Sequence, residues 1–331
     1  MLEKIHMYLK AYHLLERFEL CEPITVEFLA QGEYNQNFLI SDQTRKFVFR
    51  LNYGSQLHLD NQVQYEYQAL KWLERTKRTP KVYYVDDHKN FFDQGLLIME
   101  YLAGSPLDYR SDLSEAAKIF GKIHQQPLDE TANRLFVKET QSILSARTTE
   151  CEQLLDPVFK SNYISKFAKH QFDEALDWCK NNVKQQQFFI DLNQWCVTNT
   201  EVNSHNFIIG QQSFLIDWEK PVISHAVQDI SQFLASTTTL WRSNLILSQT
   251  EKEQFIQAYL KDTHFDNETF KEALHIYHPY LMLRALSWSA MAYDSYQTDT
   301  KELQNQEIFA KVKSYLQKDF LQQALKEQIF E

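Results

Sequence analysis

Hydrophobic and polar residues alternate in short runs along the first hundred positions of the chain. Three such runs, at 24–31, 35–42 and 46–52, are separated by short polar turns, and two more lie at 81–85 and 95–102. Alternation with a period of two is typical of half-buried strands. The pattern therefore predicts an antiparallel sheet in this part of the chain.

A different period interrupts these strands. Between residues 60 and 77 the apolar side chains recur at helical spacing, from Val63 to Leu73, and Pro80 follows as a helix breaker. The segment predicts one helix among five strands. The first 18 residues also have helical spacing, and they lack the continuous apolar core of a signal peptide.

From residue 111 onward the period is mostly helical. Ser248 and Glu251 have the spacing of a capping box at the start of one helix. One strand-like interruption remains, a hairpin in 205–218 with Gly210 at its turn. The chain thus reads as a strand-rich region over 1–103 and a helical region over 104–331. The expected helices are 111–126, 160–184, 226–236, 248–262, 266–297 and 301–329.

Composition excludes several classes of protein. The 331 residues carry a net charge of −10, and the one dense basic run is at 75–78, so nucleic acid is not expected as a partner. No apolar run reaches the roughly 18 residues of a membrane span. The four cysteines are widely spaced, which suits the reducing cytoplasm. The sequence indicates a cytoplasmic globular protein whose oligomeric state is undetermined.

The glycines exclude the common nucleotide-binding motifs. There are six, at positions 32, 54, 95, 104, 121 and 210, and no two lie within five positions of each other. A Walker loop and a GxGxxG fingerprint are both impossible with this spacing. A nucleotide, if one binds, requires another architecture.

Three polar residues around the hairpin suggest chemistry. In "TNTEVNSHNFIIG" (198–210) Glu201 precedes Asn206 by five positions, and Asp217 ends the apolar run of "SFLID" eleven positions later. An acid and an amide on one loop, followed by an acid at a strand end, can hold metal ions and a hydroxyl substrate around a phosphate. An isolated acid and amide at this spacing is common by chance, so the surrounding order of elements decides its meaning.

That order resembles the aminoglycoside phosphotransferase and choline kinase group of the protein-kinase-like fold, over about residues 20 to 300. The resemblance is carried by seven segments in the family's order, from the hairpin to the acidic motif and the helix after it. It implies an α+β fold with a small antiparallel-sheet lobe and a mostly helical lobe. The segments are "LAQGEYNQNFLI", "FVFRL", "QYEYQALKWL", "LLIMEYLAGSPL", "AAKIFGKIHQ", "NTEVNSHN" and "IDWE" with "AVQDISQFL".

The resemblance also implies which residues bind a nucleotide. Gly32 would lie in the hairpin that covers it, and Arg50 would contact its phosphates with Glu66 as the partner of that cation. Glu100 and Tyr101 would form the hinge beside the base. ATP in a cleft between the lobes is the implied cofactor.

The same resemblance assigns the catalytic and metal-binding roles. Glu201 would deprotonate the acceptor hydroxyl, Asn206 and Asp217 would bind Mg²⁺, and Glu219 would contact a second metal ion. Hard oxygen donors of this kind suit Mg²⁺. The reaction implied is transfer of the γ-phosphate of ATP to a hydroxyl of a small molecule.

Two positions depart from the family's pattern. Asn199 replaces its loop histidine, and Glu201 replaces its aspartate, which lengthens the side chain by one methylene. A nucleotide-binding pseudokinase that acts through a protein partner is therefore an alternative to an active kinase. A protein kinase is less favoured, since only eleven residues separate Asp217 from Asp229 and leave no room for a peptide-docking segment.

The acceptor is predicted from one aromatic position. Trp288 matches the first of two tryptophans that choline kinases place on a late helix, whereas Met291 occupies the second. An indole face attracts an ammonium group. The sequence thus suggests an amino alcohol or an aminoglycoside-like compound, while an aromatic helix face packed in a core explains Trp288 equally well.

Overall fold

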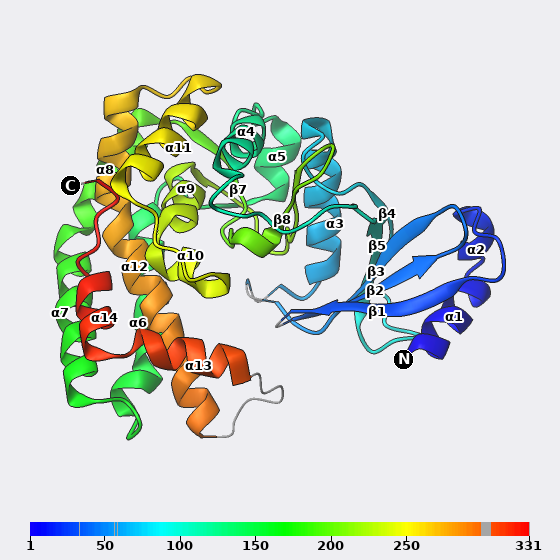
Figure 1. Cartoon of the computed structure of the whole chain (residues 1–331), viewed down its shortest axis with the longest axis horizontal. Helices are drawn as coiled ribbons and strands as arrows, with labels where there is room; N and C mark the ends of the chain where they lie inside the picture. The colour runs from blue at the N-terminus through cyan, green and yellow to red at the C-terminus, as the bar shows by residue number, and fades with distance from the viewer. Residues whose placement is uncertain (33, 56, 58, 299–305, 331) are drawn as a thin grey trace. The chain divides into compact units, whose positions relative to one another are not determined.

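The computed structural model describes residues 1–32, 34–55, 57, 59–298 and 306–330, and the chain divides into two compact units (Figure 1). Two later segments of the chain complete the first unit. The division after residue 103 into two consecutive lobes stays a prediction. The first unit comprises Met1–Pro106, Asp129–Phe136 and Asn206–Pro221, and the second comprises Leu107–Leu128, Val137–His205 and Val222–Glu331.

The sheet of the first unit consists of the strands that the alternation predicts. All neighbouring strands run antiparallel, and the turns that join the first three are only a few residues long, so their register is set locally. The predicted antiparallel sheet is confirmed. Its strands are β1 (Thr25–Gln31), β2 (Asn35–Ser41), β3 (Lys46–Asn52), β4 (Val82–Asp86) and β5 (Gly95–Glu100), in the order β1-β2-β3-β5-β4.

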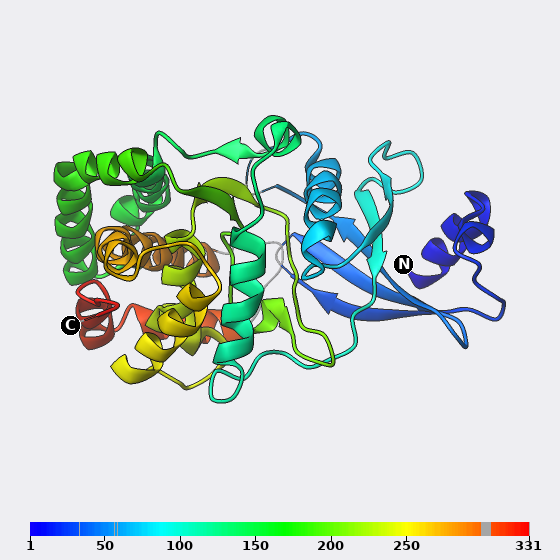
Figure 2. The ribbon, with the colours of Figure 1, turned by 90° about the horizontal axis from the view of Figure 1, so that it is seen from above.

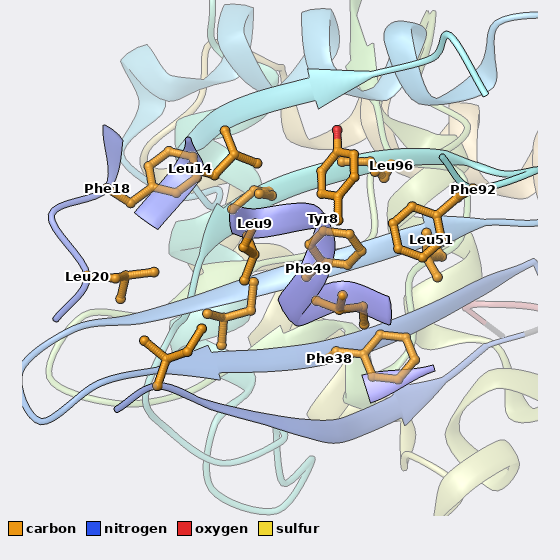
Figure 3. Packing of buried hydrophobic residues seen from close by; sticks show 14 residues of the cluster. Tyr8, Leu9, Leu14, Phe18, Leu20, Phe38, Phe49, Leu51, Phe92 and Leu96 are labelled. Carbon is orange, nitrogen blue, oxygen red and sulfur yellow. The ribbon is translucent and has the colours of Figure 1, made fainter. Parts of the chain in front are cut away.

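One face of this sheet is covered by the N-terminal helices α1 (Leu2–Ala11) and α2 (Leu14–Arg17). Figure 3 shows Tyr8 and Leu9 of α1 among the side chains of the cluster, beside Phe49. The hydroxyl of Tyr8 donates a hydrogen bond of 2.6 Å to a carboxylate oxygen of Asp86. The expectation of one helix among the five strands was wrong. The first 18 residues, which have helical spacing, also form helices, because their apolar stripe packs on this apolar face of the sheet.

The opposite face carries α3 (Gln62–Leu73), which continues as the 3-10 turn η1 (Glu74–Thr76) (Figure 2). Side chains of a strand alternate between faces, so Phe49 points into the cluster under α1 while Arg50 points toward α3. There Arg50 meets Glu66 of α3. Because side chains alternate along β3, Arg50 is a buried cation on the face of the sheet opposite the hydrophobic cluster.

Two later segments complete the first unit. The short helix α5 (Glu130–Leu135) begins at Asp129, which accepts a hydrogen bond of 2.9 Å from the indole of Trp72. The predicted hairpin around Gly210 is present as β8 (Phe207–Ile208) and β9 (Phe214–Leu215). Its turn approaches residue 104 so closely that a Cβ there would lie 2.4 Å from the carbonyl oxygen of Ile209. Glycine is therefore required at position 104.

The second unit is mostly helical, as predicted. The helix α12 (Asn267–Gln297) is its longest. It packs against α6 (Ile143–Lys160), α7 (Lys166–Asn182), α9 (Val227–Leu234) and α13 (Gln306–Tyr315) (Figures 1 and 2). The capping box of Ser248 and Glu251 is formed. The remaining helices are α4 (Leu113–His124), α8 (Gln186–Leu192), α10 (Ser236–Arg242), α11 (Gln249–Lys261) and α14 (Lys318–Ala324), with the 3-10 turn η2 (Val183–Gln185).

Two helix boundaries differ from the prediction. The helix expected to start at residue 160 starts at Lys166, because Ser165 caps it by accepting a hydrogen bond from the N–H of Ala168. The single helix expected over 301–329 is two helices, α13 and α14, since the backbone at Gln317 is extended. Its first five positions, 301–305, lie outside the described residues.

A small sheet in the second unit was not predicted. It consists of β6 (Val137–Lys138), β10 (Val222–His225) and β7 (Trp195–Thr198), with β10 in the middle. All four residues of β10 are buried, so the strand shows no alternation that would reveal it. The expectation of a single strand-like interruption after residue 111 was wrong for this reason.

A buried histidine in β10 makes the stability of the second unit depend on pH. Burial, with a smaller effect of His124, lowers the pKa of His225 to about 3, and its ring lies among Phe189, Phe265 and Phe270. In the unfolded chain the ring takes up a proton near pH 6.5, so the folded state loses stability as pH falls below that value.

We therefore expect His225→Gln to flatten the pH dependence of unfolding. Between pH 6.5 and pH 5 the parent should lose about 2 kcal/mol more than the variant. Urea unfolding at the two pH values measures this, with His275→Gln, an exposed position on α12, as the control. Equal losses in the parent and in His225→Gln would contradict the prediction.

Candidate active site

The first unit brings together three of the predicted site residues. Nη1 of Arg50 lies 2.5 Å from Oε1 of Glu66 and 3.2 Å from Oδ1 of Asp217. The side chains of Arg50 and Glu66 are 7% and 1% exposed, whereas that of Asp217 is 30% exposed. A buried ion pair thus contacts one oxygen of an acid whose side chain is partly exposed. Nε of Arg50 also donates to Asn37 on the neighbouring strand at 3.0 Å.

The charges of this group depend on one another. Burial opposes the charge of Arg50, but Glu66, Asp217 and Glu219 outweigh it, so the pKa of the guanidinium lies above its ordinary value. Burial also raises the pKa of Glu66 against the attraction of Arg50. Within the described residues, Oε2 of Glu66 is buried without a hydrogen-bond partner. The guanidinium is therefore a permanent cation fixed beside Asp217.

The backbone of Asp217 is strained. Asp217 comes just after β9 and has φ of +66°, in the left-handed region that few residues other than glycine adopt. Such conformations cost on the order of 1–3 kcal/mol and cluster at ligand-binding sites. The N–H of Ile216, the residue before Asp217, donates to the carbonyl oxygen of Asn206 at 2.7 Å. The two predicted metal ligands therefore lie on backbone segments that are hydrogen-bonded to each other. Asn206 itself is buried.

Glu219 lies in the same segment and is held from α3. Nε2 of Gln62 donates to its carbonyl oxygen at 2.6 Å, and its side chain is largely buried. Among the described residues there is no group of three or more His, Cys, Asp or Glu side chains that could hold a metal ion. Mg²⁺ needs less than that, because it is commonly bound by one or two carboxylates together with the phosphates of a substrate. The oxygens of Asn206, Asp217 and Glu219 fit that mode.

The predicted nucleotide contacts at the hairpin and hinge lie in the same unit. Among the described residues, a Cβ added at Gly32 would have only the carbonyl oxygen of Asn35 within 4.0 Å, and these neighbours do not require glycine there. Close approach of a ligand would give a reason for it. Glu100 is bound to Lys81 through both its N–H and its carboxylate, and the ring of Tyr101 lies under Nζ of Lys46. The carboxylate of Glu100 therefore accepts a hydrogen bond from the backbone of Lys81, just before β4.

The second unit holds Glu201 on a loop that follows β7. Thr200, just before it, has φ of +70°, which is unusual for a β-branched residue. The carboxylate of Asp229 maintains this conformation by accepting hydrogen bonds of 2.8 Å from the N–H groups of Asn199 and Thr200. Oδ1 of Asn199 in turn accepts from the N–H of Glu201 at 3.1 Å. Asp229 thus braces this loop, and Asn199 supports it at the position where the family that the sequence resembles has histidine.

Asp229 is itself fixed by buried neighbours. Nε2 of His124 lies 3.2 Å from Oδ2 of Asp229, and Nδ1 lies 2.8 Å from the hydroxyl of Tyr259. The side chains of His124 and Asp229 are both fully buried. The loop that carries Glu201 therefore rests on a rigid polar network and not on surface contacts.

Arg284 is a charged neighbour of Glu201 that the sequence did not predict. Nη2 of Arg284, on α12, lies 3.7 Å from Oε1 of Glu201. Arg284 is the one charged residue between Glu272 and Asp294 in a stretch that is otherwise apolar or neutral. A lone charge in an apolar helix that packs in a core requires a partner. The lone Arg284 was therefore the sequence signal that pointed to a buried ion pair on this helix.

Trp288 lies one helical turn after Arg284 and is partly buried. Its ring packs edge to face against Trp241, with 5.7 Å between the ring centroids. Trp241 lines a cavity of about 580 Å³ in the second unit, next to His205. Burial, with the nearby charge of Arg242, lowers the pKa of His205. Charged residues of both signs line the same cavity, namely Arg242, Glu307 and Lys311.

The fold and the family comparison identify a kinase-like phosphotransferase. The chain belongs to the phosphotransferase enzyme family, whose profile matches residues 25–272. This confirms the resemblance to aminoglycoside phosphotransferases and choline kinases, as well as the predicted fold class. A search of curated proteins gave no match. Among the described residues, no helix has the length and hydropathy needed to span a membrane.

Solved structures with the same fold are distant in sequence. The ethanolamine kinase of Plasmodium vivax superposes with a TM-score of 0.64 at 15% identity, over 94% of this chain and 87% of that one. A spectinomycin phosphotransferase in complex with ADP and spectinomycin gives 0.63 at 13% identity, over 92% and 93%. The choline kinase LicA of Streptococcus pneumoniae gives 0.58 at 15% identity, over 93% and 98%. At these identities the similarity establishes the fold and leaves the substrate open.

Proposed function

We propose that this protein is an ATP- and Mg²⁺-dependent kinase that transfers the γ-phosphate to a hydroxyl group of a small molecule. The observation that carries the proposal is the contact of one buried guanidinium, Arg50, with both Glu66 and Asp217. This arrangement provides a fixed cation and an accessible carboxylate for a nucleotide phosphate and its metal ion.

The nucleotide is assigned to residues of the first unit. Arg50 binds phosphate oxygens and Glu66 fixes its guanidinium, while Gly32 lets the hairpin backbone approach the ligand and the main chain at Glu100 and Tyr101 faces the base. Asp217, Asn206 and Glu219 would hold Mg²⁺, which supplies neutralisation of the charge on the phosphates. Related structures have been crystallised with ADP, AMP or GDP, so both purine nucleotides belong in a binding test.

Glu201 of the second unit is assigned as the base. Phosphoryl transfer needs a group that orients the acceptor hydroxyl and takes up its proton. The loop of Glu201 is held by Asp229 and Asn199, which supports a retained catalytic geometry despite the two departures from the family pattern. A nucleotide-binding pseudokinase is therefore not favoured, since decay would not be expected to keep both the strained loop and the oxygen ligands.

The acceptor is assigned to the cavity beside Trp241. Neighbouring structures are kinases of ethanolamine and choline and phosphotransferases of aminoglycosides and spectinomycin. The aromatic wall and Glu307 would suit the ammonium of an amino alcohol or an aminoglycoside-like compound. Arg242 and Lys311 would suit an acidic group on the same molecule. We place this activity in the cytoplasm, where the free thiols of all four cysteines would persist.

A panel of acceptors tests the proposal. We expect ADP release from MgATP to rise at least about tenfold with one class of alcohol among ethanolamine, choline, kanamycin, spectinomycin, glucose and glycerate. The phosphorylated product should appear by mass spectrometry in the same reaction. Omission of Mg²⁺ should abolish the signal. No product from any acceptor, together with no stabilisation of the protein by millimolar MgATP or MgGTP, would refute it.

A further inference from the structure

The carboxylate of Glu201 faces an arginine that nothing in the family pattern predicted. Nη2 of Arg284 lies 3.7 Å from Oε1 of Glu201, and the side chains are 14% and 24% exposed. We propose that Arg284 is a positioning residue for Glu201, which holds the base where its longer arm reaches the acceptor hydroxyl. This inference rests on the proposed function, because Glu201 needs a defined position only if it works as a base.

Arg284 is fixed by a chain of alternating charges. Its Nε donates to Oε1 of Glu150 at 3.1 Å, and the other oxygen of Glu150 accepts from Nη1 of Arg147 at 2.6 Å. Arg147 continues the chain to Glu139. Each arginine lies between two carboxylates, so rotation of either arginine would break two ion pairs. The guanidinium of Arg284 therefore presents a fixed charge to Glu201.

One end of this chain is hydrogen-bonded to the small sheet of the second unit, and the other end lies on the loop that follows that sheet's strand β7. At one end the N–H of Glu139 donates to the carbonyl oxygen of Ile223 in β10 at 2.9 Å. At the other end Glu201 follows β7, the strand that pairs with β10 through Ile223 and Val197. The charges thus run from β10 through α6 and α12 back to the loop after β7, where they end at Glu201.

Burial makes the pairing significant. Burial opposes the charge of Arg284, yet Glu150 and Glu201 outweigh it, and the pKa of its guanidinium lies above the ordinary value. A charge in such surroundings interacts more strongly with its neighbours than a surface charge does. Removal of Arg284 would leave Glu150 with Arg147 alone and would leave Glu201 without this partner.

The pair gives a reason for glutamate at position 201. An aspartate has one carbon–carbon bond less, about 1.5 Å, so its carboxylate would retreat from the guanidinium to about 5 Å. At that separation the two groups would lie beyond ion-pair distance, and the guanidinium would orient the carboxylate less strongly. Glu201 and Arg284 are therefore a matched pair, in which the longer acid is oriented by a cation on α12.

Substitutions of Arg284 test the positioning role. With the panel acceptor that gives the highest turnover, Arg284→Met should lower kcat about 10–100-fold, because a shift of about 1 Å in a catalytic group can cost a hundredfold. The KM for MgATP should stay within about twofold, since the nucleotide ligands lie in the first unit. Arg284→Lys keeps the charge and should recover part of kcat. Arg147→Met removes a buried arginine of the same chain that pairs with Glu139 and Glu150; it should lower the melting temperature as much and kcat less.

A double-mutant cycle with Glu201→Gln separates this role from general stability. In the Glu201→Gln background, Arg284→Met should cost no more than about twofold in kcat, and the fall in melting temperature should be smaller than the sum of the two single changes. Additive effects on melting temperature would overturn the pairing even if no acceptor is found. If the effects on melting temperature are coupled but the parent shows no turnover with any acceptor, the proposed function is refuted. Arg284 is then a structural residue, and the positioning role is overturned as well.

Discussion

Asp217→Asn is expected to lower turnover about 10²–10³-fold and to remove most of the Mg²⁺-dependent stabilisation by nucleotide. The carboxylate lies 3.2 Å from the guanidinium of Arg50 and is the most exposed member of that group, so it is the oxygen donor best placed to meet a metal-bound phosphate. Asparagine tolerates the left-handed backbone at this position and keeps the shape of the side chain. The change therefore isolates the charge.

Thermal-shift titration with MgATP, compared with ATP in the presence of EDTA, measures the effect. The parent should be stabilised by several degrees more with Mg²⁺ than without it, and Asp217→Asn should show little difference. Glu16→Ala, at an exposed acid on α2, is the control for loss of one negative charge in the same unit. Equal Mg²⁺-dependent stabilisation in Asp217→Asn and in the parent would show that Asp217 is not the metal ligand.

Glu201→Gln is expected to lower kcat about 10²–10⁴-fold while nucleotide affinity hardly changes. Glutamine keeps the length and most of the hydrogen bonding of the side chain but cannot take up the proton of the acceptor. The main-chain contact that supports the loop, from the N–H of Glu201 to Asn199, is unaffected by the substitution. The loss should therefore appear in the chemical step alone.

Steady-state kinetics with the best acceptor and a separate measurement of nucleotide Kd distinguish the two effects. Gln187→Glu, at an exposed position on α8 in the same unit, controls for a change between amide and acid. A Glu201→Gln enzyme as active as the parent would show that proton uptake occurs elsewhere. A parallel loss of nucleotide affinity would indicate damage beyond the acceptor side.

The sheet of the first unit was predictable because each strand carries its own pattern. Phe49 and Leu51 alternate with Arg50, and that alternation states both the strand and its two faces. The pairing of Arg50 with Glu66 was anticipated from the resemblance alone, whereas the contact of Arg50 with Asp217, which lies 167 positions away, was not predicted. Family order supplied what local pattern could not.

The small sheet and the Arg284 network were beyond the sequence for a physical reason. The strand β10 is buried throughout and too short to show a period, so its residues read as loop or helix start. Arg284 is conspicuous as a lone charge on α12, but its partner Glu150 lies 134 positions away on α6. Pairing across such separations depends on tertiary packing, which composition and periodicity do not encode.

The rate of Glu201→Asp relative to the parent tests the central claim most directly. If the protein is a working kinase whose base is adapted to the glutamate arm and to Arg284, the aspartate carboxylate stops about 1.5 Å short and kcat should fall about 10–100-fold. The nucleotide Kd should be unchanged. If the loop has instead decayed from an aspartate-bearing ancestor, the same substitution restores the reach for which the loop was built. A Glu201→Asp enzyme clearly faster than the parent would contradict the account.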